Sequence, residues 1–250
     1  MSAGETAAQP CKFKETGMDL RIPRQSDMAQ MLAGFPLFQG LDETCRTRVA
    51  ARARERRLER NEILFQKGDP ARSLYLVVYG QIKLALPGAN GNEKVVELVG
   101  PLQNFGEESL LTDSPHPVFA QAVTPSLLVQ IQKDAIHDLV ECAPAFARSM
   151  LANLARHARK LIQDVETYTQ HKGAQRVIGY LHDHCPTGGN PDVSIAVTLP
   201  ASKQLIASRL NLTPETFSRI LRDLEEASLI EVQGKQIRIT NLRRLREYDS

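Results

Sequence analysis

The sequence predicts an α+β protein: short antiparallel strands, then one long helix, then a helix-turn-helix followed by a β-hairpin. Three observations carry this prediction. Between residues 61 and 132, short runs of strand-forming residues alternate with turn residues, which is typical of an antiparallel sandwich or barrel. From Ala147 to Tyr168, apolar residues recur at alternating steps of four and three, the spacing of a long amphipathic helix. Two closely coupled helical segments and a hairpin with a glycine turn follow after Pro200.

The composition is that of a soluble globular protein, with 42% hydrophobic and 24% charged residues in a chain of 250. This length suits one large domain or two ordinary ones. The longest apolar run, residues 74–79, is too short to span a bilayer, and the first ten residues lack the apolar core of a secretory signal. We therefore expect a cytoplasmic protein with no membrane partner. A net charge of +2 neither requires nor excludes a polyanionic partner.

Residues 1–26 are polar and aperiodic and are expected to form a flexible tail. The sheet domain is expected over 27–143, and it begins with a short helix over residues 30–41. Residues 47–57 carry a dense run of arginines interleaved with small apolar residues. This pattern favours a helix with a solvated basic face over a nucleic-acid-binding patch, because charge runs are usually solvated faces.

Six strands are expected in the sheet domain, separated by turns such as Gly68-Asp69-Pro70 and Gly100-Pro101. Closing such a sheet on itself protects the strand edges from pairing with other chains. The six strands are Ile63–Phe65, Leu74–Tyr79, Ile82–Leu86, Lys94–Val99, Val118–Val123 and Leu127–Ile131.

The long helix is expected over residues 144–170. Its apolar seam keeps a 3.5-residue period for about three repeats, whereas a helix that lies on its own domain usually has a wider stripe. We therefore expect the helix to pair with its copy in a homodimer, in a parallel or antiparallel arrangement. The seam consists of Ala147, Leu151, Leu154, Ala158, Leu161, Val165 and Tyr168.

The C-terminal domain is expected over residues 171–250. It begins with a helix over 172–184, a loop over 185–192 and a strand over 193–199. A helix-turn-helix follows, with residues 202–209 as its first helix.

The second helix of this motif is the candidate DNA-reading element. Thr213 suits the N-cap, and Pro214 suits the first helical position, where a missing N–H costs nothing. On the outward face, Arg219 can donate two hydrogen bonds to guanine in the major groove, and Glu215 can accept one from cytosine. The alternative is an i,i+4 ion pair that only decorates a solvated helix. The inward face carries Phe217, Ile220, Leu221 and Leu224, and the outward face carries Glu215, Ser218, Arg219 and Arg222.

A hairpin directly after a helix-turn-helix makes a winged helix. It is predicted over residues 229–232 and 236–239, with Gly234 in the turn and with Lys235 and Arg238 as candidates for phosphate contacts. The candidate DNA-contacting residues are Lys203, Thr213, Glu215, Thr216, Ser218, Arg219, Arg222 and Lys235.

From about residue 32 to residue 240 the chain resembles the Crp/Fnr superfamily of transcription regulators. The resemblance rests on Gly68-Asp69-Pro70-Ala71, Gly80 after Tyr75-Leu76-Val77-Val78-Tyr79, Phe105-Gly106-Glu107, the dimer helix and the winged helix. It implies a cyclic-nucleotide-binding-like β-roll that acts as a sensor, a dimerisation helix, a DNA-binding domain and RNA polymerase as a further partner. The Glu215, Ser218 and Arg219 positions match the Glu-x-x-Ser-Arg motif of the fumarate–nitrate regulator branch, which implies TTGAT half-sites in an inverted repeat.

The same resemblance makes two effectors unlikely. Where the cyclic-nucleotide branch has an Arg-Ser pair that holds the phosphate, this chain has Pro117-Val118, which argues against cyclic AMP. The four-iron iron–sulfur members carry an N-terminal cysteine cluster, whereas this tail has Cys11 alone. The four cysteines, Cys11, Cys45, Cys142 and Cys185, are scattered without a CxxC pair, so no metal site is predicted from them.

The chain is most similar to the dissimilatory nitrate respiration regulator group, through residues 200–205 and 214–219. That similarity implies a haem cofactor, a response to nitric oxide and activation of anaerobic or denitrification genes. The candidate effector-pocket residues are Gly106, Glu107, His116 and His157.

Two other functions remain open from the residues. One is a ligand sensor that acts through a protein partner, but the intact Glu215, Ser218 and Arg219 face argues against it. The other is an enzyme on a cupin-like barrel, which needs inward histidines and carboxylates. The predicted strands contain almost no histidine, so we expect no enzyme activity.

Overall fold

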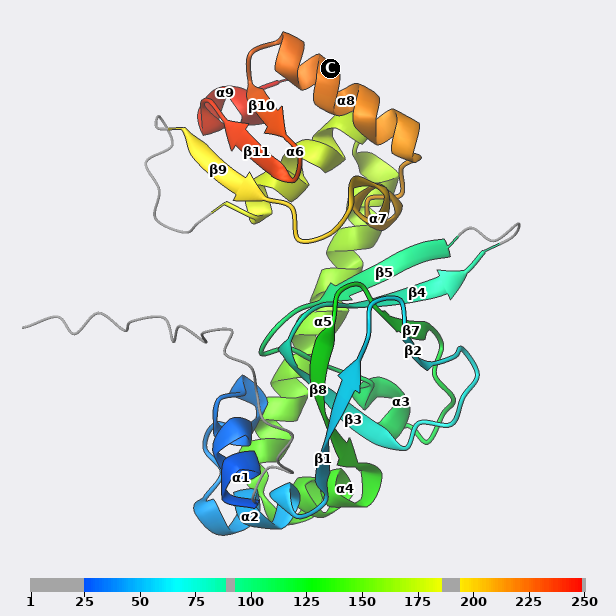
Figure 1. The fold of residues 1–250 in the computed structure, drawn as a ribbon, viewed down its shortest axis with the longest axis vertical. Helices are drawn as coiled ribbons and strands as arrows, with labels where there is room; N and C mark the ends of the chain where they lie inside the picture. Colours follow the sequence, from blue (N-terminus) through cyan, green and yellow to red (C-terminus); the bar gives the residue numbers. More distant parts are fainter. Residues whose placement is uncertain (1–24, 89–92, 186–193, 249–250) are drawn as a thin grey trace, which may run out of the picture.

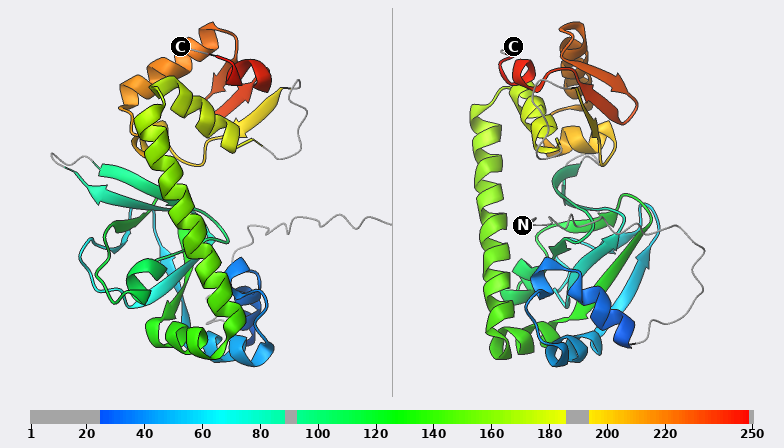
Figure 2. Two further views of the ribbon diagram at one scale, coloured as in Figure 1. Left: turned by 180° about the vertical axis from the view of Figure 1, so that it is seen from behind. Right: turned by 90° about the vertical axis from the view of Figure 1, so that its left-hand side faces the viewer.

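The computed structural model describes residues 25–88, 93–185 and 194–248. Its longest element is α5 (Pro144–Gln170), a helix of 27 residues that runs along the length of the molecule (Figure 1). Seen from the side, the β-rich N-terminal part and the C-terminal part both lie on one side of α5 (Figure 2). The opposite side of this helix therefore faces away from both parts.

The N-terminal part contains two four-stranded antiparallel sheets, with the strand orders β1-β8-β3-β6 and β2-β7-β4-β5. Apolar side chains from both sheets, including Phe65, Val77, Ile82 and Leu128, form one core between them. The strands are β1 (Ala53–Leu58), β2 (Ile63–Phe65), β3 (Ser73–Tyr79), β4 (Ile82–Pro87), β5 (Glu93–Val99), β6 (Asn104–Phe105), β7 (Phe119–Ala122) and β8 (Ser126–Gln132). All six predicted strands are present within one or two residues of their expected limits.

Helices close one end of this sandwich. A second core joins the helices before the sheets to α4 and the first turns of α5, with Leu32, Phe38, Ile136 and Phe146 fully buried. The rings of Phe38 and Phe146 lie 5.3 Å apart, so the start of α5 is fixed against the N-terminal helices. The helices at this end are α1 (Gln25–Ala33), the short 3-10 helix η1 (Pro36–Phe38), α2 (Glu43–Ala50) and α4 (Lys133–Cys142). Helix α3 (Glu107–Leu111) lies beside β3 (Figure 1).

The helix predicted over residues 47–57 is wrong in its second half. Helix α2 ends at Ala50, and residues 53–58 form strand β1, which pairs with β8 along its whole length. Arg54 and Arg56 are exposed while Ala53 and Glu55 are half-buried, an alternation with the two-residue period of a strand. The many arginines in this segment made its two-residue period hard to recognise in the sequence. The expected tail also ends earlier, because α1 begins at Gln25.

The C-terminal part is a winged helix-turn-helix. Helices α6, α7 and α8 pack with a three-stranded sheet, β10-β11-β9, around Val177, Ile206, Phe217 and Ile237. Its elements are α6 (Gly173–Asp183), β9 (Ile195–Thr198), α7 (Lys203–Arg209), α8 (Pro214–Glu226), β10 (Ile230–Gln233), β11 (Gln236–Ile239) and α9 (Leu242–Arg246). The loop predicted over 185–192 lies outside the described residues, apart from Cys185. The predicted fold class is therefore confirmed.

Within the described ranges, none of the helices combines the length and the apolar character that crossing a membrane requires.

Candidate functional site

The outward face of helix α8 is fixed by caps and by a buried inner face. The Oγ of Ser202 accepts a hydrogen bond from the N–H of Leu205 at the start of α7. The Oγ1 of Thr213 accepts one from the N–H of Thr216, at 3.1 Å. Asn211 supplies the turn between the helices with φ 57°, a left-handed conformation that asparagine tolerates well. The predicted inner face is found buried: Phe217, Ile220, Leu221 and Leu224.

This packing leaves the predicted reading residues on the surface. Glu215, Ser218, Arg219 and Arg222 are all exposed. In the part of the chain that the structure describes, Glu215 and Arg219 form no ion pair with each other or with another residue. The i,i+4 pair that would only decorate a solvated helix is therefore not formed, and both side chains are available to bases.

The other candidate DNA contacts divide into two kinds. Lys235 is exposed at the tip of the β10–β11 hairpin, next to Gly234 with φ 61°. Thr213 and Thr216, in contrast, hydrogen-bond to each other at the start of α8, and Lys203 is half-buried. Arg238 donates a hydrogen bond to Glu231 across the hairpin at 2.9 Å, so this residue already has a partner in the wing.

Three residues of the predicted dimer seam, Leu154, Ala158 and Leu161, line a cavity between α5 and the N-terminal domain, and other seam residues are exposed. Leu151 and Val165 have 67% and 62% of their surface exposed. Ile162, which the heptad pattern omits, is 69% exposed. The hydroxyl of Tyr168, in contrast, donates a hydrogen bond to the carbonyl of Arg209 at 2.5 Å. It therefore contacts its own C-terminal domain, and Ile162 takes its place among the exposed apolar residues.

A cavity of about 320 Å³ lies between α5 and the sheet that contains β4 and β5. Glu107, at the start of α3, lines it and is fully buried. Its Oε1 accepts a hydrogen bond from Asn153 at 3.0 Å and lies 3.1 Å from Nδ1 of His157. Its Oε2 is buried and has no hydrogen-bond partner among the described residues. Two of the four predicted effector residues, Glu107 and His157, are thus in direct contact.

The other two predicted effector residues, Gly106 and His116, are not among the described residues that line this cavity. Gly106 has φ 90°, a left-handed conformation that strains other residues, and it turns the chain into α3. A Cβ on Gly106 would lie 3.6 Å from the ring of His116. His116 is buried and stacks on Phe65 with the ring centroids 3.7 Å apart. Burial lowers the pKa of His116, which keeps the ring neutral inside the roll.

Every cationic side chain around this cavity already has an anionic partner. The hydrogen bond that His157 donates to Glu107 is the main reason that the pKa of His157 is raised. Lys160 lies 2.5 Å from Glu97. Asp164 accepts two hydrogen bonds from Arg209 of α7, at 2.9 and 2.7 Å.

The C-terminal domain docks on the exposed edge of strand β5. Ser208 of α7 donates a hydrogen bond to the carbonyl of Glu93 at 2.8 Å and accepts one from the N–H of Val95 at 2.9 Å. Lys94 donates to the carbonyl of Ser208 at 2.6 Å. Burial lowers the pKa of Lys94 to about 8, and nearby Arg209 adds to this effect. We call this the interdomain contact: Ser208 and Arg209 of α7 with residues 93–95 of β5 and with Asp164 and Tyr168 of α5. No local sequence pattern marks these residues as partners.

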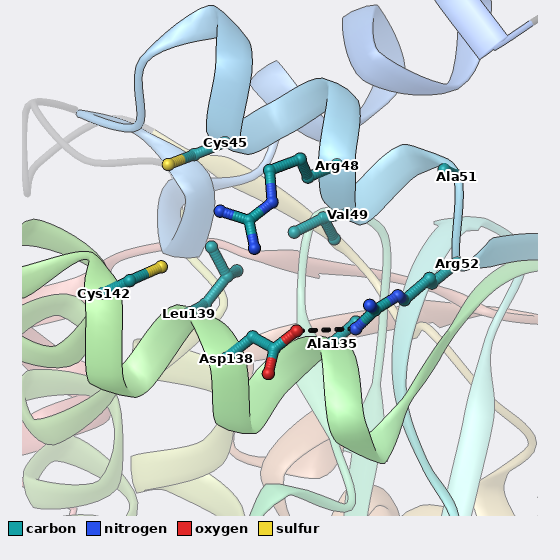
Figure 3. A pocket seen from close by; sticks show the side chains of 9 residues that line it. All are labelled: Cys45, Arg48, Val49, Ala51, Arg52, Ala135, Asp138, Leu139 and Cys142. Carbon is teal, nitrogen blue, oxygen red and sulfur yellow. Dashed lines mark hydrogen bonds and ion pairs between the residues drawn. The ribbon is translucent and has the colours of Figure 1, made fainter.

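A second hollow, of about 250 Å³, lies between α2 and α4 (Figure 3). Cys45 and Cys142 line it, together with Arg52, which donates a hydrogen bond to Asp138 at 2.7 Å. Burial and the hydrogen bond to Asp42 raise the pKa of the Cys45 thiol, so this cysteine stays protonated and weakly nucleophilic. Among the described residues, no group of three or more histidine, cysteine or acidic side chains is placed to hold a metal ion.

The geometry defines a class of protein: a DNA-binding transcription regulator with an N-terminal β-roll domain. Residues 55–141 match the family model of the cyclic nucleotide-binding domain, and residues 175–248 match that of the Crp-like helix-turn-helix domain. The chain is 32% identical over 186 residues to the "Global nitrogen regulator" of Synechococcus elongatus, across 73% of this chain and 84% of that protein. The chain belongs to the Crp/Fnr family of transcriptional regulators, as its sequence predicted.

Solved structures give the same result. A putative cyclic nucleotide binding protein from Ruegeria pomeroyi is 30% identical, with a TM-score of 0.58 over 89% of this chain and 98% of that one. The sensor domain of the transcriptional regulator DNR from Pseudomonas aeruginosa is 26% identical, with a TM-score of 0.50 over 56% of this chain and 93% of that domain. Relatives of this chain are transcriptional regulators rather than enzymes, in agreement with the expected lack of enzyme activity.

Proposed function

We propose that this regulator binds, as a homodimer, an inverted repeat of TTGAT half-sites and reads bases with Glu215, Ser218 and Arg219. The observation that carries the proposal is the outward face of α8, a capped helix with a buried inner face. On this face Glu215 and Arg219 are exposed, and neither forms an ion pair with any residue that the structure describes. A guanidinium suits guanine and a carboxylate suits the cytosine amino group. The proposed limits of the sensor, helix and DNA-binding domain are 27–143, 144–170 and 171–250, and α1 begins just before the first of these limits, at Gln25.

A gel shift with single-base variants of the repeat tests this proposal. Replacing Arg219 by alanine should weaken binding to the repeat by about 1–3 kcal/mol and relax the preference at one base pair of each half-site. Arg60→Ala is the matched control, because Arg60 is an exposed arginine in the turn after β1 and is not part of the helix-turn-helix. Equal loss of affinity for the repeat and for scrambled DNA would show that Arg219 contacts phosphate, and base reading by this residue would then be wrong.

Dimerisation through α5 follows from its exposed apolar side. Leu151, Ile162 and Val165 are each more than half exposed in the single chain. Contact of this apolar surface with water is unfavourable, and a second copy of the chain would remove it by covering these residues. A two-fold axis along α5 would place two α8 helices on one side of the dimer. They must enter major grooves about 34 Å apart to read one repeat. As the resemblance implies, the bound dimer would act on RNA polymerase as an activator.

The cavity is the site where an effector would control DNA binding. It lies between the sensor sheet and α5, and its wall includes Glu97, Lys160 and Asp164. Asp164 also holds Arg209 of the interdomain contact. We propose that a ligand which moves Asp164 changes how α7, and with it α8, is held against the sensor domain. That would be the physical link between ligand and DNA.

The haem implied by the resemblance does not fit this cavity. Haem brings two propionates, but Lys160 and His157 are already paired with Glu97 and Glu107. Glu108 adds a further carboxylate to the wall. His116 lies inside the roll against Phe65 and does not line the cavity among its described residues. We therefore derive no step through haem, and a nitric oxide response would need another receptor group.

A further inference from the structure

We propose that Cys45 and Cys142 bind one soft monovalent metal ion, such as Cu(I), between their sulfur atoms in the hollow between α2 and α4. This hollow shares no described lining residue with the cavity beside α5 and lies apart from α8, so the inference goes beyond the proposed function and does not depend on it. The observations that carry it are two thiols from different helices, an arginine beside them and the small number of other donors.

The fold brings the two thiols together from distant parts of the sequence. Cys45 lies in the first turn of α2, where its N–H donates a hydrogen bond to the N-cap Asp42 at 2.7 Å, and Cys142 is the last residue of α4. Both line the hollow of about 250 Å³, and Figure 3 shows their sulfurs on the same side of it with no labelled side chain between them. A negative charge on Cys142 is among the causes that raise the pKa of Cys45, so the two groups are close enough to interact.

The number and kind of donors select the metal. Thiolates are soft ligands that favour Cu(I), whereas Zn²⁺ in proteins almost always takes four ligands. Among the described residues that line the hollow, Asp138 is the one acidic side chain, and it already accepts a hydrogen bond from Arg52 at 2.7 Å. Two sulfur donors therefore remain, which suits an ion that is satisfied with two ligands.

An arginine balances the charge of the loaded site. When two thiols bind Cu(I), each loses one proton to water and its sulfur gives an electron pair to the ion, so the complex carries one negative charge. Arg48 lines the hollow, and Figure 3 shows its guanidinium turned into it. Among the described residues Arg48 forms no ion pair, so its positive charge is available to the complex.

The site is open to solvent and lies next to the start of α5. Cys142 is exposed and Cys45 is half-buried, so an ion reaches both sulfurs without opening the core. Ala143 follows Cys142 as the C-cap of α4, and α5 begins at Pro144. An ion held by both thiols would therefore tie the junction of α4 and α5 to α2 and stabilise the N-terminal group of helices.

Competition for Cu(I) tests the inference with the full-length, reduced protein in the absence of oxygen. Replacing Cys11 and Cys185 by serine leaves Cys45 and Cys142 as the two thiols of the chain. Cu(I) is supplied as its acetonitrile complex, together with a chelator whose copper complex is coloured. We expect this double variant to withdraw one Cu(I) per chain from the chelator and to melt at a higher temperature with the ion than without it, because a ligand of the folded state stabilises that state.

Adding Cys45→Ser or Cys142→Ser to the double variant should weaken Cu(I) binding about 10²- to 10⁴-fold, since a single thiolate cannot chelate the ion. Thr44→Ser, an equally small change at the exposed neighbour of Cys45, is the matched control and should leave the affinity unchanged. Circular dichroism of the metal-free proteins checks that each variant is folded. The inference is overturned if the double variant binds no Cu(I), if it binds one ion per two chains, or if either added serine leaves the affinity unchanged. Equal stabilisation by Zn²⁺ would overturn the choice of a soft monovalent ion.

Discussion

Removing the hydroxyl of Ser208 should loosen the interdomain contact without disturbing either domain. That hydroxyl donates to the carbonyl of Glu93 and accepts from the N–H of Val95, at 2.8 and 2.9 Å. Each hydrogen bond is worth about 0.5–1.5 kcal/mol net. Strand β5 is an edge strand, so water can reach the backbone groups that lose their partner. We therefore expect Ser208→Ala to weaken the interdomain contact by about 1–2 kcal/mol.

The amide of Val95 reports this loss directly. Hydrogen–deuterium exchange at this N–H should become about tenfold faster in Ser208→Ala, since about 1.4 kcal/mol corresponds to a factor of ten. Amides of β4, which pair with β5 on its other side, should exchange as before. Ser218→Ala, on the exposed face of α8, is the matched control and should leave Val95 protected.

An unchanged exchange rate at Val95 in Ser208→Ala would refute the reasoning. It would mean that the edge of β5 is covered without this hydroxyl, and that the orientation of α7 depends on other contacts. Faster exchange throughout both domains would refute it as well, because the serine would then support a core rather than a contact between domains.

Two further predictions concern α5. Val165→Glu should raise the dissociation constant of the dimer at least about tenfold, because two carboxylates would meet in an apolar seam. Sedimentation velocity measures this change, with Gln170→Glu as the control. An unchanged dissociation constant would exclude Val165 from the interface. The pairing with Glu107 raises the pKa of His157 above its ordinary 6.5, so its stabilisation is fully present below about pH 6.5 and is lost as pH rises through the folded-state value. As the pH rises from about 6.5 through the folded-state pKa of His157, the melting temperature of the parent protein should therefore fall relative to that of His157→Gln. If the melting temperatures of the two proteins change in parallel with pH, the pairing is contradicted.

Local patterns were sufficient to predict most of the fold. The strands around Leu74–Tyr79 and Leu127–Ile131 are short runs bounded by turn residues, and the cap at Thr213 with Pro214 marks the start of α8. The pattern failed where charge hid the alternation of a strand, as in β1 with Arg54 and Arg56. Amphipathic strands that carry arginines on one side are hard to distinguish from basic helices by composition alone.

The candidate site was predictable only where one element carries it. Glu215 and Arg219 lie on a single helix, so their shared outward face follows from spacing. Glu107 and His157 come from α3 and α5, 50 residues apart in sequence, and their contact depends on how the sheet packs on α5. Ser208 is a common residue at the end of a short helix, and nothing local marks it as a partner of β5.

We propose three roles for α5: it forms the dimer interface, it forms one wall of the effector cavity, and it holds the C-terminal domain through the interdomain contact. These roles are not independent, because some side chains of α5 take part in more than one of them. Leu161 lines the cavity and is also 54% exposed, next to the apolar surface that we propose as the dimer interface. Asp164, one turn further along, lines the cavity and accepts a hydrogen bond from Arg209 of the C-terminal domain. A ligand that displaces this turn of α5 therefore changes the dimer surface and the interdomain contact together. For this reason, a substitution at Leu161 should alter both the response to the effector and the affinity of the dimer. Ile162 is 69% exposed and is not among the described residues that line the cavity. A substitution at Ile162 should therefore alter the affinity of the dimer alone.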